Sequence, residues 1–558
     1  MDWLFAHQGL GRRVRNTRRV REVVGVAARY GFADPLRAVL GRRLSRWRQG
    51  STPQDVAQQS AAVRFRLALA ELSTTFIKFG QMLSTRADLV GEEVAGELAR
   101  LQNDTAPDSP GVAEATIEAE LGAAPATLFA SFDPVPFASA SIAQVHYARL
   151  HSGERVVVKV QRQGIGARID TDLSILADLA ELAERHIGDA RRYHPVAVVR
   201  QFTKTMTGEL DFRRELRNMQ RFRANFAGEP HVRFPAPFPE FSTRRVLTME
   251  RLEGVLVSQM KRRTAPEDEL LEFARRGARV YLDMIFRDGF YHADPHPGNL
   301  MLLPGEVVGV LDCGMVQRLD DDLREWIEDL LGGVVHGDAT AVTTALAELS
   351  TSSPVLGRQR LAFDVAELLD DFAEQAVGGA GGDIGVLVGG LMQVVHRHHL
   401  MLPPGASLLL RMLAVLEGTV RLLHPSFSLV EVVEPYAAAA VRRRYTPGHV
   451  WRELQGGARE WQRLLRSLPG DLNEMVRRTR AGTLSVHLEH RRLDPVVNRL
   501  VLGLLTSSLL LGSSLLWSMH APPLVGGVSL FGAIGYVLAL VMGLSLWRRA
   551  KRSEEPQD

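Results

Sequence analysis

Residues 291–299 read Tyr291-His292-Ala293-Asp294-Pro295-His296-Pro297-Gly298-Asn299, and Asp312-Cys313-Gly314 begins thirteen residues after Asn299. Two prolines and a glycine favour a loop over a helix here. The loop therefore holds a carboxylate, Asp294, and a carboxamide, Asn299, on one short, rigid connection. Carboxylate and amide oxygens are the ligands that Mg²⁺ takes in proteins. The stretch therefore predicts a loop that carries both an aspartate and a ligand for Mg²⁺.

A lysine upstream adds to this set. The β-rich runs 144–150 and 155–160 flank His151-Ser152-Gly153-Glu154, which predicts a β-hairpin. Lys159 lies in the second strand, and we expect Glu215 on a following helix to hold it, because an unpaired lysine in so apolar a strand would lose its charge. Alone, Lys159 is better explained as a solubilising edge-strand residue. Together with Asp294, Asn299 and Asp312, it follows the order of kinase-type phosphoryl-transfer enzymes.

The loop expected to cover the phosphates lacks the usual glycines. Backbone N–H groups flanked by alanine can still approach phosphate, but with less conformational freedom than at glycine. The candidate nucleotide-binding residues of this loop are Ala138, Ser139, Ala140, Ser141, Ile142, Ala143 and Gln144.

Two further clusters lie outside the usual parts of a kinase. Lys78 and Gln81 stand three residues apart, on one face of a predicted helix. Glu209 and Asp211 precede Glu215, and either of them is a plausible partner for Lys78. Ordinary surface ion pairs are the alternative interpretation of both clusters.

Composition excludes several classes of protein. The chain has 558 residues, enough for two or more domains, and 46% of them are hydrophobic, which argues against disorder. The net charge of +3 gives no nucleic-acid-binding signature. The single cysteine, Cys313, excludes an intrachain disulfide and a multi-cysteine zinc site. Only five of the 67 basic residues are lysine, so a lysine at a motif position suggests a need for a compact ammonium.

Both ends of the chain suggest a membrane. Leu500–Met519 and Leu524–Trp547 carry no charged residue and are each long enough to cross the ~30 Å hydrocarbon layer. Basic residues flank the pair, which predicts a transmembrane hairpin with the catalytic part facing the cytoplasm, at the inner membrane. A buried core hairpin is the alternative. Near the N-terminus, an arginine-rich run predicts contact with anionic lipid, a solvated helix face or a short organellar targeting peptide: Arg12, Arg13, Arg15, Arg18, Arg19 and Arg21.

Small residues recur at four-residue spacing in the second apolar run, at Gly535, Ala539 and Gly543. Such spacing lets helices approach closely. We favour packing of the two helices of the hairpin, and a homodimer stays possible.

As a set, these motifs resemble the UbiB (AarF-type) family of atypical protein-kinase-like proteins, which support ubiquinone and related isoprenoid-quinone biosynthesis. The resemblance spans roughly residues 60–550 and rests on Lys78-x-Gly80-Gln81, the alanine-rich loop, Lys159, Glu209-x-Asp211, His292–Asn299, Asp312-x-Gly314 and the terminal apolar pair. Two positions depart from the expected pattern. Ser139 replaces the middle alanine of the family's loop, and Cys313 stands where ordinary kinases carry phenylalanine.

The resemblance implies a role for each residue. Lys159 would contact the phosphates of ATP or ADP and pair with Glu215, and Asp294 would be the catalytic aspartate. Asn299 and Asp312 would hold Mg²⁺. In addition, Lys78 and Gln81 would occupy the region where a kinase admits its protein substrate, held by Glu209 and Asp211.

The resemblance also implies an α+β, bilobal kinase-like fold. We expect a basic N-terminal segment (1–55), a helical extension (56–120), an N-lobe (121–260), a helical C-lobe (261–440), a basic helical linker (441–498) and a transmembrane hairpin (499–548). The leading functional hypothesis is a membrane-anchored ATPase that handles quinone precursors, other lipids or the enzymes that modify them. A phosphotransferase acting on a small molecule or protein is the second hypothesis, and a non-catalytic nucleotide-binding scaffold is the third.

Overall fold

The structure is a computed structural model that describes residues 10–32, 56, 58–101, 107–186, 193–260, 266–350, 357–375, 383–425, 427–444, 493–519, 522–525 and 528–551. Most of the predicted basic linker at 441–498 lies outside these residues. The chain forms two units, Met1–Val450 and Trp451–Asp558, and each is described by itself.

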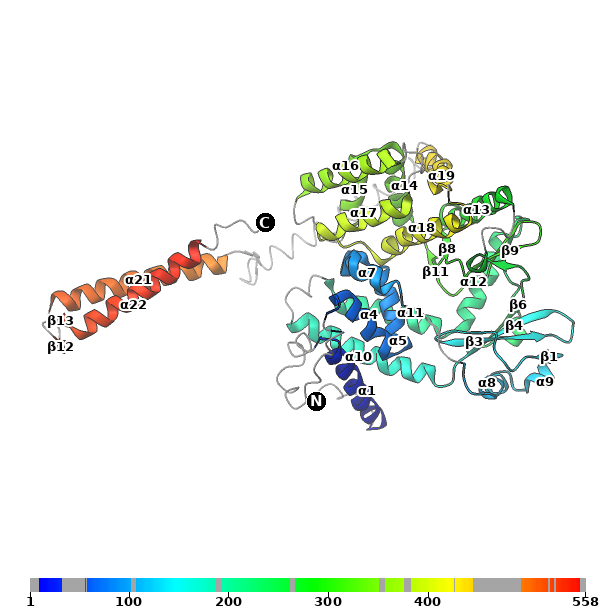
Figure 1. Cartoon of the computed structure of the whole chain (residues 1–558), viewed down its shortest axis with the longest axis horizontal. Coiled ribbons are helices and arrows are strands. Elements are labelled where there is room, and N and C mark those ends of the chain that lie inside the picture. The colour runs from blue at the N-terminus through cyan, green and yellow to red at the C-terminus, as the bar shows by residue number, and fades with distance from the viewer. Residues whose placement is uncertain are drawn as a thin grey trace, which may run out of the picture. The chain divides into compact units, whose positions relative to one another are not determined.

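An antiparallel sheet forms the first lobe of the larger unit (Figure 1). Its strands run in the order β1-β3-β4-β6, with β2 paired to β3: β1 (Ser131–Phe132), β2 (Ala138–Ser139), β3 (Ala143–Arg149), β4 (Arg155–Gln161) and β6 (Val246–Glu250). The hairpin prediction is confirmed, because β3 and β4 pair along their whole length. Val156, Val158 and Val160 are fully buried on one face of β4. Since side chains alternate along a strand, Lys159 projects from the opposite face.

Helices precede and follow the first strands of this sheet in the chain. Those before it are α4 (Ala61–Leu72), α5 (Thr74–Ser84), α6 (Ala87–Val90), α7 (Glu92–Leu98), α8 (Val112–Leu121) and α9 (Pro125–Leu128). Those after β4 are α10 (Ile165–His186), α11 (Pro195–Glu209) and α12 (Phe212–Asn225). Asp211 caps α12, because its carboxylate accepts the N–H of Arg213 at 3.2 Å. This cap fixes where Glu215 stands, one turn into the helix.

The second lobe is mostly helical and carries the two loops singled out in the sequence. Its helices are α13 (Glu267–Leu282), continued by a π-turn at Asp283–Arg287, α14 (Asp321–His336), α15 (Ala339–Leu349), α16 (Arg358–Gln375), α17 (Ile384–Arg397), α18 (Pro404–Leu423) and α19 (Leu429–Arg444). Its strands are β5 (Val232–Arg233), β7 (Val255–Leu256), β8 (Phe290–His292), β9 (Leu300–Leu303), β10 (Val307–Val310) and β11 (Val316–Arg318). The loop from β8 to β9 holds Asp294 and Asn299, and the loop from β10 to β11 holds Asp312. Because β8 pairs with β11, with His292 opposite Val316, the two loops are brought together.

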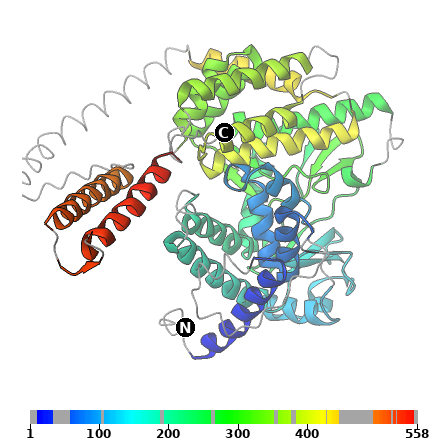
Figure 2. The ribbon, with the colours of Figure 1, turned by 60° about the vertical axis from the view of Figure 1, so that its left-hand side comes forward.

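The helical extension before the sheet packs against the second lobe. Helices α6 and α7 contact α17, and the blue helices lie beside the second lobe in both Figure 1 and Figure 2. Arg86 donates to the Leu402 carbonyl at 3.3 Å, and His396 on α17 bonds the Asp88 carbonyl at 3.2 Å. The extension therefore bridges the sheet lobe and the helical lobe.

The first helix, α1 (Leu10–Arg29), is fastened to this extension by a buried arginine. Arg19 is only 9% exposed, and its guanidinium donates to the Asp172 carboxylate at 2.7 Å and to the Leu72 carbonyl at 2.7 Å. Ser73 also donates to Asp172, at 3.0 Å. Arg19 is therefore part of the core, and neither lipid contact nor a solvated face describes it.

Replacing Arg19 by Met is expected to lower the free energy of unfolding by about 3–5 kcal/mol, because fully buried Asp172 loses its counter-charge. Chemical denaturation would measure the loss. Arg18→Met is the matched control, since Arg18 is exposed on the same helix, and it should change stability by less than about 0.5 kcal/mol. Equal stability of the two variants would contradict this role for Arg19.

The smaller unit contains two antiparallel helices, α21 (Leu493–Ser518) and α22 (Leu530–Lys551), joined through the short strands β12 (Leu524–Val525) and β13 (Val528–Ser529). Small residues pack them together: a Cβ at Gly535 would collide with Ser513, and Ala539 is 2% exposed. Among the helices as the structure describes them, none has the length and apolar character needed to cross a membrane. The transmembrane hairpin predicted from the sequence is thus unsupported by the structure.

Candidate active site

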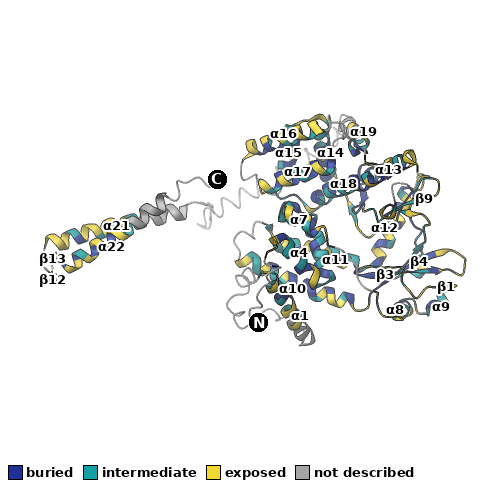
Figure 3. Ribbon diagram, in the orientation of Figure 1, coloured by how far each residue is buried: buried dark blue, intermediate teal, exposed yellow. Residues whose placement is uncertain are grey.

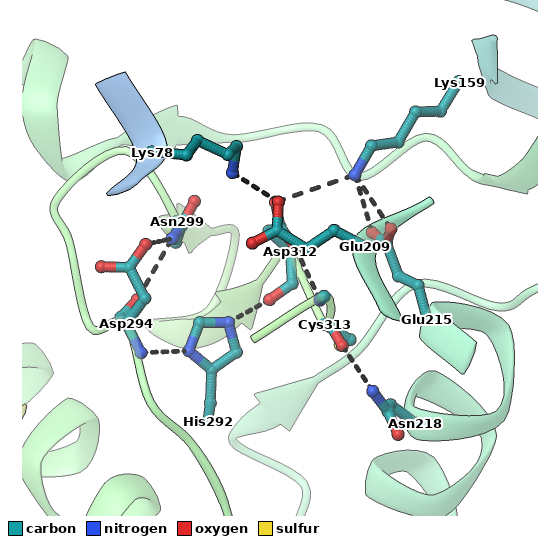
Figure 4. A network of polar contacts seen from close by, with 11 residues as sticks. Lys78, Lys159, Glu209, Glu215, Asn218, His292, Asp294, Asn299, Asp312 and Cys313 are labelled. Atoms are coloured by element: carbon teal, nitrogen blue, oxygen red, sulfur yellow. Dashed lines mark hydrogen bonds and ion pairs between the residues drawn. The ribbon is translucent and has the colours of Figure 1, made fainter. Parts of the chain in front are cut away.

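The cluster that organises the site joins the two lobes. Lys159 on β4 lies 3.0 Å and 2.9 Å from the two carboxylate oxygens of Glu215 on α12, and 3.8 Å from a carboxylate oxygen of Asp312 (Figure 4). Burial lowers the pKa of Lys159, but the Asp312 and Glu215 carboxylates outweigh it and the pKa is raised above its ordinary value. Lys159 therefore stays an ammonium, with one carboxylate holding it and a second within reach.

Asp312 is the more accessible of these two carboxylates. Its side chain is 47% exposed, whereas that of Glu215 is 6% exposed. One of its oxygens accepts the N–H of Gly314 at 2.7 Å. Burial acts to raise the pKa of Asp312, but Lys159 and the Gly314 N–H more than compensate, and the pKa lies below its ordinary value. Asp312 is therefore ionised at neutral pH and presents a carboxylate to solvent.

The catalytic-loop residues are held by hydrogen bonds within the loop and from α18. The Asn299 amide nitrogen donates to both the backbone carbonyl and the carboxylate of Asp294, each at 3.1 Å. Among the residues that the structure describes, none donates a hydrogen bond to the amide oxygen of Asn299, which is therefore left for another partner. The Thr419 hydroxyl on α18 donates to the Pro295 carbonyl at 2.7 Å, which fastens the loop to α18.

A Mg²⁺ ion would suit this arrangement. The Asp312 carboxylate and the Asn299 amide oxygen are hard oxygen ligands, and one or two protein ligands suffice when substrate phosphates and water complete the shell. Bound there, the ion would neutralise charge on the phosphates of a nucleotide.

His292 ties the two loops to each other, a role the sequence analysis did not assign. Its Nδ1 accepts the N–H of Asp294 at 3.1 Å, so the proton lies on Nε2, which donates to the Asp312 carbonyl. The His292 residue is 1% exposed, and the Tyr281 ring packs nearly perpendicular to its imidazole. Its position in the sequence, two residues before Asp294 and at the end of a buried strand, was the signal from which this role could have been predicted.

Replacing His292 by Phe is expected to keep the ring in place and remove both hydrogen bonds. The kcat for ATP turnover should fall by about 10- to 100-fold, as for other residues that orient a site without touching substrate. Stability should fall by about 1–3 kcal/mol. The matched control is His336→Phe on α14, which should leave kcat unchanged. An unaltered kcat in His292→Phe would refute the positioning role.

Only part of the second predicted cluster assembles. Lys78 on α5 lies 2.5 Å from a carboxylate oxygen of Glu209, and it reaches the Lys159 and Asp312 cluster (Figure 4). Asp211 does not hold Lys78, contrary to the prediction: its carboxylate caps α12 and binds Arg213 at 2.8 Å, because it stands at the helix start, turned toward its own first turn. Gln81 donates to the Leu101 carbonyl at 3.0 Å, which fastens α5 to the end of the extension.

The alanine-rich loop forms a tight hairpin between β2 and β3, closed by the Ala140 N–H donating to the Ala143 carbonyl at 2.8 Å. Arg162 donates to the Ser139 hydroxyl at 2.6 Å and to the Ala140 carbonyl at 2.9 Å. The hydroxyl at Ser139 is therefore used within the protein. Four residues of the loop are buried: Ser141, Ile142, Ala143 and Gln144. The amide oxygen of Gln144 accepts the N–H of Asp108 at 3.1 Å.

A cavity of about 660 Å³ lies away from this cluster. It is lined by α8, the start of α10 and the segment before β6, including Gln161, Arg162 and Arg245. None of Lys159, Asp294, Asn299 or Asp312 lines it, so this cavity is distinct from the candidate active site.

Comparisons with known proteins place the chain in a family. A model described as "ABC1 atypical kinase-like domain" matches residues 100–346, which include Lys159, Glu215, Asp294, Asn299 and Asp312. A second model, "ABC1/UbiB kinase-like C-terminal domain", matches residues 487–552.

Curated relatives agree with these matches. A "Probable protein kinase UbiB" of Pseudomonas paraeruginosa is 36% identical over 72% of this chain and 76% of its own. The same-named protein of Aeromonas salmonicida is 33% identical over 82% and 83%. An uncharacterized protein of Clostridium pasteurianum is 28% identical over 95% and 97%.

One solved structure, a Mycobacterium tuberculosis protein in complex with erythromycin, is 20% identical and covers 64% of this chain and 86% of its own, with a TM-score of 0.42. That similarity is too low to inform the site. On the sequence matches, the fold is protein-kinase-like, and the chain belongs to the ABC1/UbiB family of atypical kinase-like enzymes.

Proposed function

We propose that the protein is a Mg²⁺-dependent ATPase that supports the synthesis of ubiquinone or a related isoprenoid quinone. One observation carries the catalytic part of the proposal: Lys159, Glu215 and Asp312 meet in one cluster, to which His292 ties Asp294. The pathway is inferred from membership of the UbiB family.

The residues divide the chemistry among them. Lys159 binds the α- and β-phosphates of ATP, while Asp312 and Asn299 are the residues that would hold Mg²⁺, which supplies positive charge to the phosphates. Asp294 orients an attacking water and accepts its proton. The new oxygen–phosphorus bond forms as the bond from the γ-phosphorus to the ADP oxygen breaks, which gives ADP and phosphate.

A phosphotransferase is the second candidate. The ion pair between Lys78 and Glu209 argues against an ordinary protein kinase, because both side chains are largely buried, at 19% and 17% exposure, where an acceptor would approach. A small acceptor fits this arrangement better than a peptide. A non-catalytic scaffold is less consistent with the site, because Asp312 is exposed and ionised beside Lys159.

We further propose that the C-terminal hairpin associates with the membrane, where quinone precursors, other lipids and quinone-biosynthesis enzymes reside. The apolar runs at 500–519 and 524–547 support this proposal. So do the apolar residues exposed on its surface, among them Leu511 (70%), Leu515 (63%), Val537 (62%) and Leu540 (66%). Figure 3 colours much of the described part of α21 and α22 as exposed.

Deletion of the gene, followed by mass-spectrometric profiling of quinones, tests the proposed pathway. We expect an altered quinone profile that wild type restores and Asp294→Asn does not. An unaltered profile would refute the role in quinone synthesis.

Alkaline extraction of isolated membranes tests the membrane association of the C-terminal hairpin. The full chain should stay in the membrane fraction, and a chain released into the supernatant would refute membrane anchoring by the hairpin.

A further inference from the structure

The cavity of about 660 Å³ in the sheet lobe has no role in the mechanism given above. Its volume lies within the range of about 300–1,000 Å³ that is usual for small-molecule sites. Gln161, the last residue of β4, and Arg162, which follows it, form part of the wall. The cavity therefore lies beside the strand that carries Lys159, but Lys159 itself does not line it.

Part of the cavity wall is apolar. Ala115 and Ala119 of α8 line it, and Ile165 and Leu210 add larger aliphatic side chains. Gly166, in the first turn of α10, lines it as well, and no atom from elsewhere in the chain lies within 4 Å of the place that a Cβ would take. This part of the wall suits the hydrocarbon portion of a ligand.

Three arginines form another part of the wall: Arg162, Arg244 and Arg245. Arg162 is held by the alanine-rich loop and by the Asp108 carboxylate, 2.6 Å away. Arg244 is exposed, and no residue that the structure describes forms an ion pair with it. Arg244 is therefore a cation of the lining whose charge a ligand could neutralise.

Two carboxylates also line the cavity, and neither lies within ion-pair distance of Arg244. Glu120 accepts the Thr243 hydroxyl at 2.7 Å and lies 3.7 Å from Arg245. Asp170 is exposed on α10, in the turn after the first. The lining thus keeps an excess of positive charge at Arg244.

The start of α10 adds donors to the same cavity. The first turn of this 22-residue helix contains no acidic residue, and among the described residues none accepts the backbone N–H of Gly166 or of Ala167. The N-terminus of a helix carries a partial positive charge, and its free N–H groups favour an anion. Gly166 and Ala167 line the cavity together with Arg244.

We propose that this cavity binds a small molecule that has an apolar body and one anionic group, a phosphate or a carboxylate. Arg244 and the first N–H groups of α10 bind the anion, since a guanidinium donates two parallel hydrogen bonds to either group. The apolar body lies against the alanines of α8. This site is separate from the proposed nucleotide site, and the inference does not depend on ATP hydrolysis.

The test uses the full-length chain saturated with Mg²⁺ and a non-hydrolysable ATP analogue, AMPPNP, so that the nucleotide site is filled. Phenyl phosphate, benzoate and uncharged benzyl alcohol are titrated separately, and binding is measured by calorimetry. We expect saturable binding of at least one of the two anions, and binding of benzyl alcohol that is at least about tenfold weaker. The tighter of the two anions identifies the preferred group.

Two variants locate the binding in the cavity. Arg244→Gln should weaken it by at least about tenfold. Gly166→Leu keeps a helical residue and places a side chain in the cavity, so saturable binding should be lost. The matched controls are Arg223→Gln, exposed on α12, and Gly96→Leu, exposed on α7, which should both bind as wild type does because neither residue lines the cavity.

Several outcomes would overturn the inference. Absence of saturable binding of both anions to wild type would do so, as would equal binding by wild type and Arg244→Gln, or equal affinity for benzyl alcohol. Displacement of the anion by Mg-AMPPNP would place it in the nucleotide site and overturn a separate site. If wild type does not bind Mg-AMPPNP, the proposed function fails, and the same titrations on the chain alone still test the cavity.

Discussion

Asp312→Asn is expected to lower the kcat for Mg²⁺-dependent ATP hydrolysis by at least about 100-fold. The substitution keeps the size of the side chain and removes the charge that Mg²⁺ needs. It also removes one of the two carboxylates near Lys159, the one 3.8 Å away. Phosphate release by the purified full-length chain, measured across a range of Mg²⁺ concentrations, is the direct readout.

The matched control for Asp312→Asn is the same substitution at an aspartate outside the site. Asp322 is exposed on α14, and Asp322→Asn should hydrolyse ATP at the wild-type rate. Because Asp312 is half-exposed, Asp312→Asn should fold normally, and its circular dichroism should match that of wild type. A folded Asp312→Asn variant with unchanged turnover would remove Asp312 as a metal ligand.

Lys159→Met is expected to have an effect of similar size, at least about 100-fold on ATP turnover. In the proposed mechanism the ammonium contacts the phosphates, and in the structure it is the counter-charge of buried Glu215. Lys159→Arg should also lose at least about tenfold, because a planar guanidinium does not replace a compact ammonium between two carboxylates. Steady-state kinetics of both variants would measure these losses, and full activity of Lys159→Arg would show that any cation suffices.

A double variant separates catalysis from folding in this pair. Lys159→Met alone leaves Glu215 buried without a counter-charge, so its free energy of unfolding should fall. Adding Glu215→Gln should recover part of that stability and none of the turnover, because the two residues act as a unit. Recovery of turnover in the double variant would contradict a direct role for Lys159.

The parts of the site predicted from the sequence are those that follow from local pattern. Two β-rich runs on either side of His151–Glu154 predicted the hairpin, and two prolines beside Asp294 predicted the loop. The contact between Lys159 and Glu215 was also predicted, because a lysine in an apolar strand requires an acid. The hairpin and the loop follow from neighbouring residues alone, whereas Glu215 lies 56 residues from Lys159 along the chain.

What escaped prediction depends on tertiary packing. Asp211 looked equivalent to Glu209 as a partner for Lys78, but a helix begins immediately after it, and its carboxylate caps that helix. His292 stands next to the loop in the sequence, but its contact with the Asp312 carbonyl, 20 residues further along, depends on the pairing of β8 with β11. Arg19 looked like a surface residue because its run is basic, yet its partner, Asp172, lies 153 residues further along.

The central claim is that Lys159, Asp294, Asn299 and Asp312 serve one bound metal–nucleotide. A crystal structure of the full-length chain with Mn²⁺ and AMPPNP, with the metal located by its anomalous scattering, tests it most directly. We predict a metal position bound by the Asp312 carboxylate and the Asn299 amide oxygen, with the Lys159 ammonium on the nucleotide phosphates. A nucleotide bound elsewhere, or a metal held by other residues, would contradict the claim.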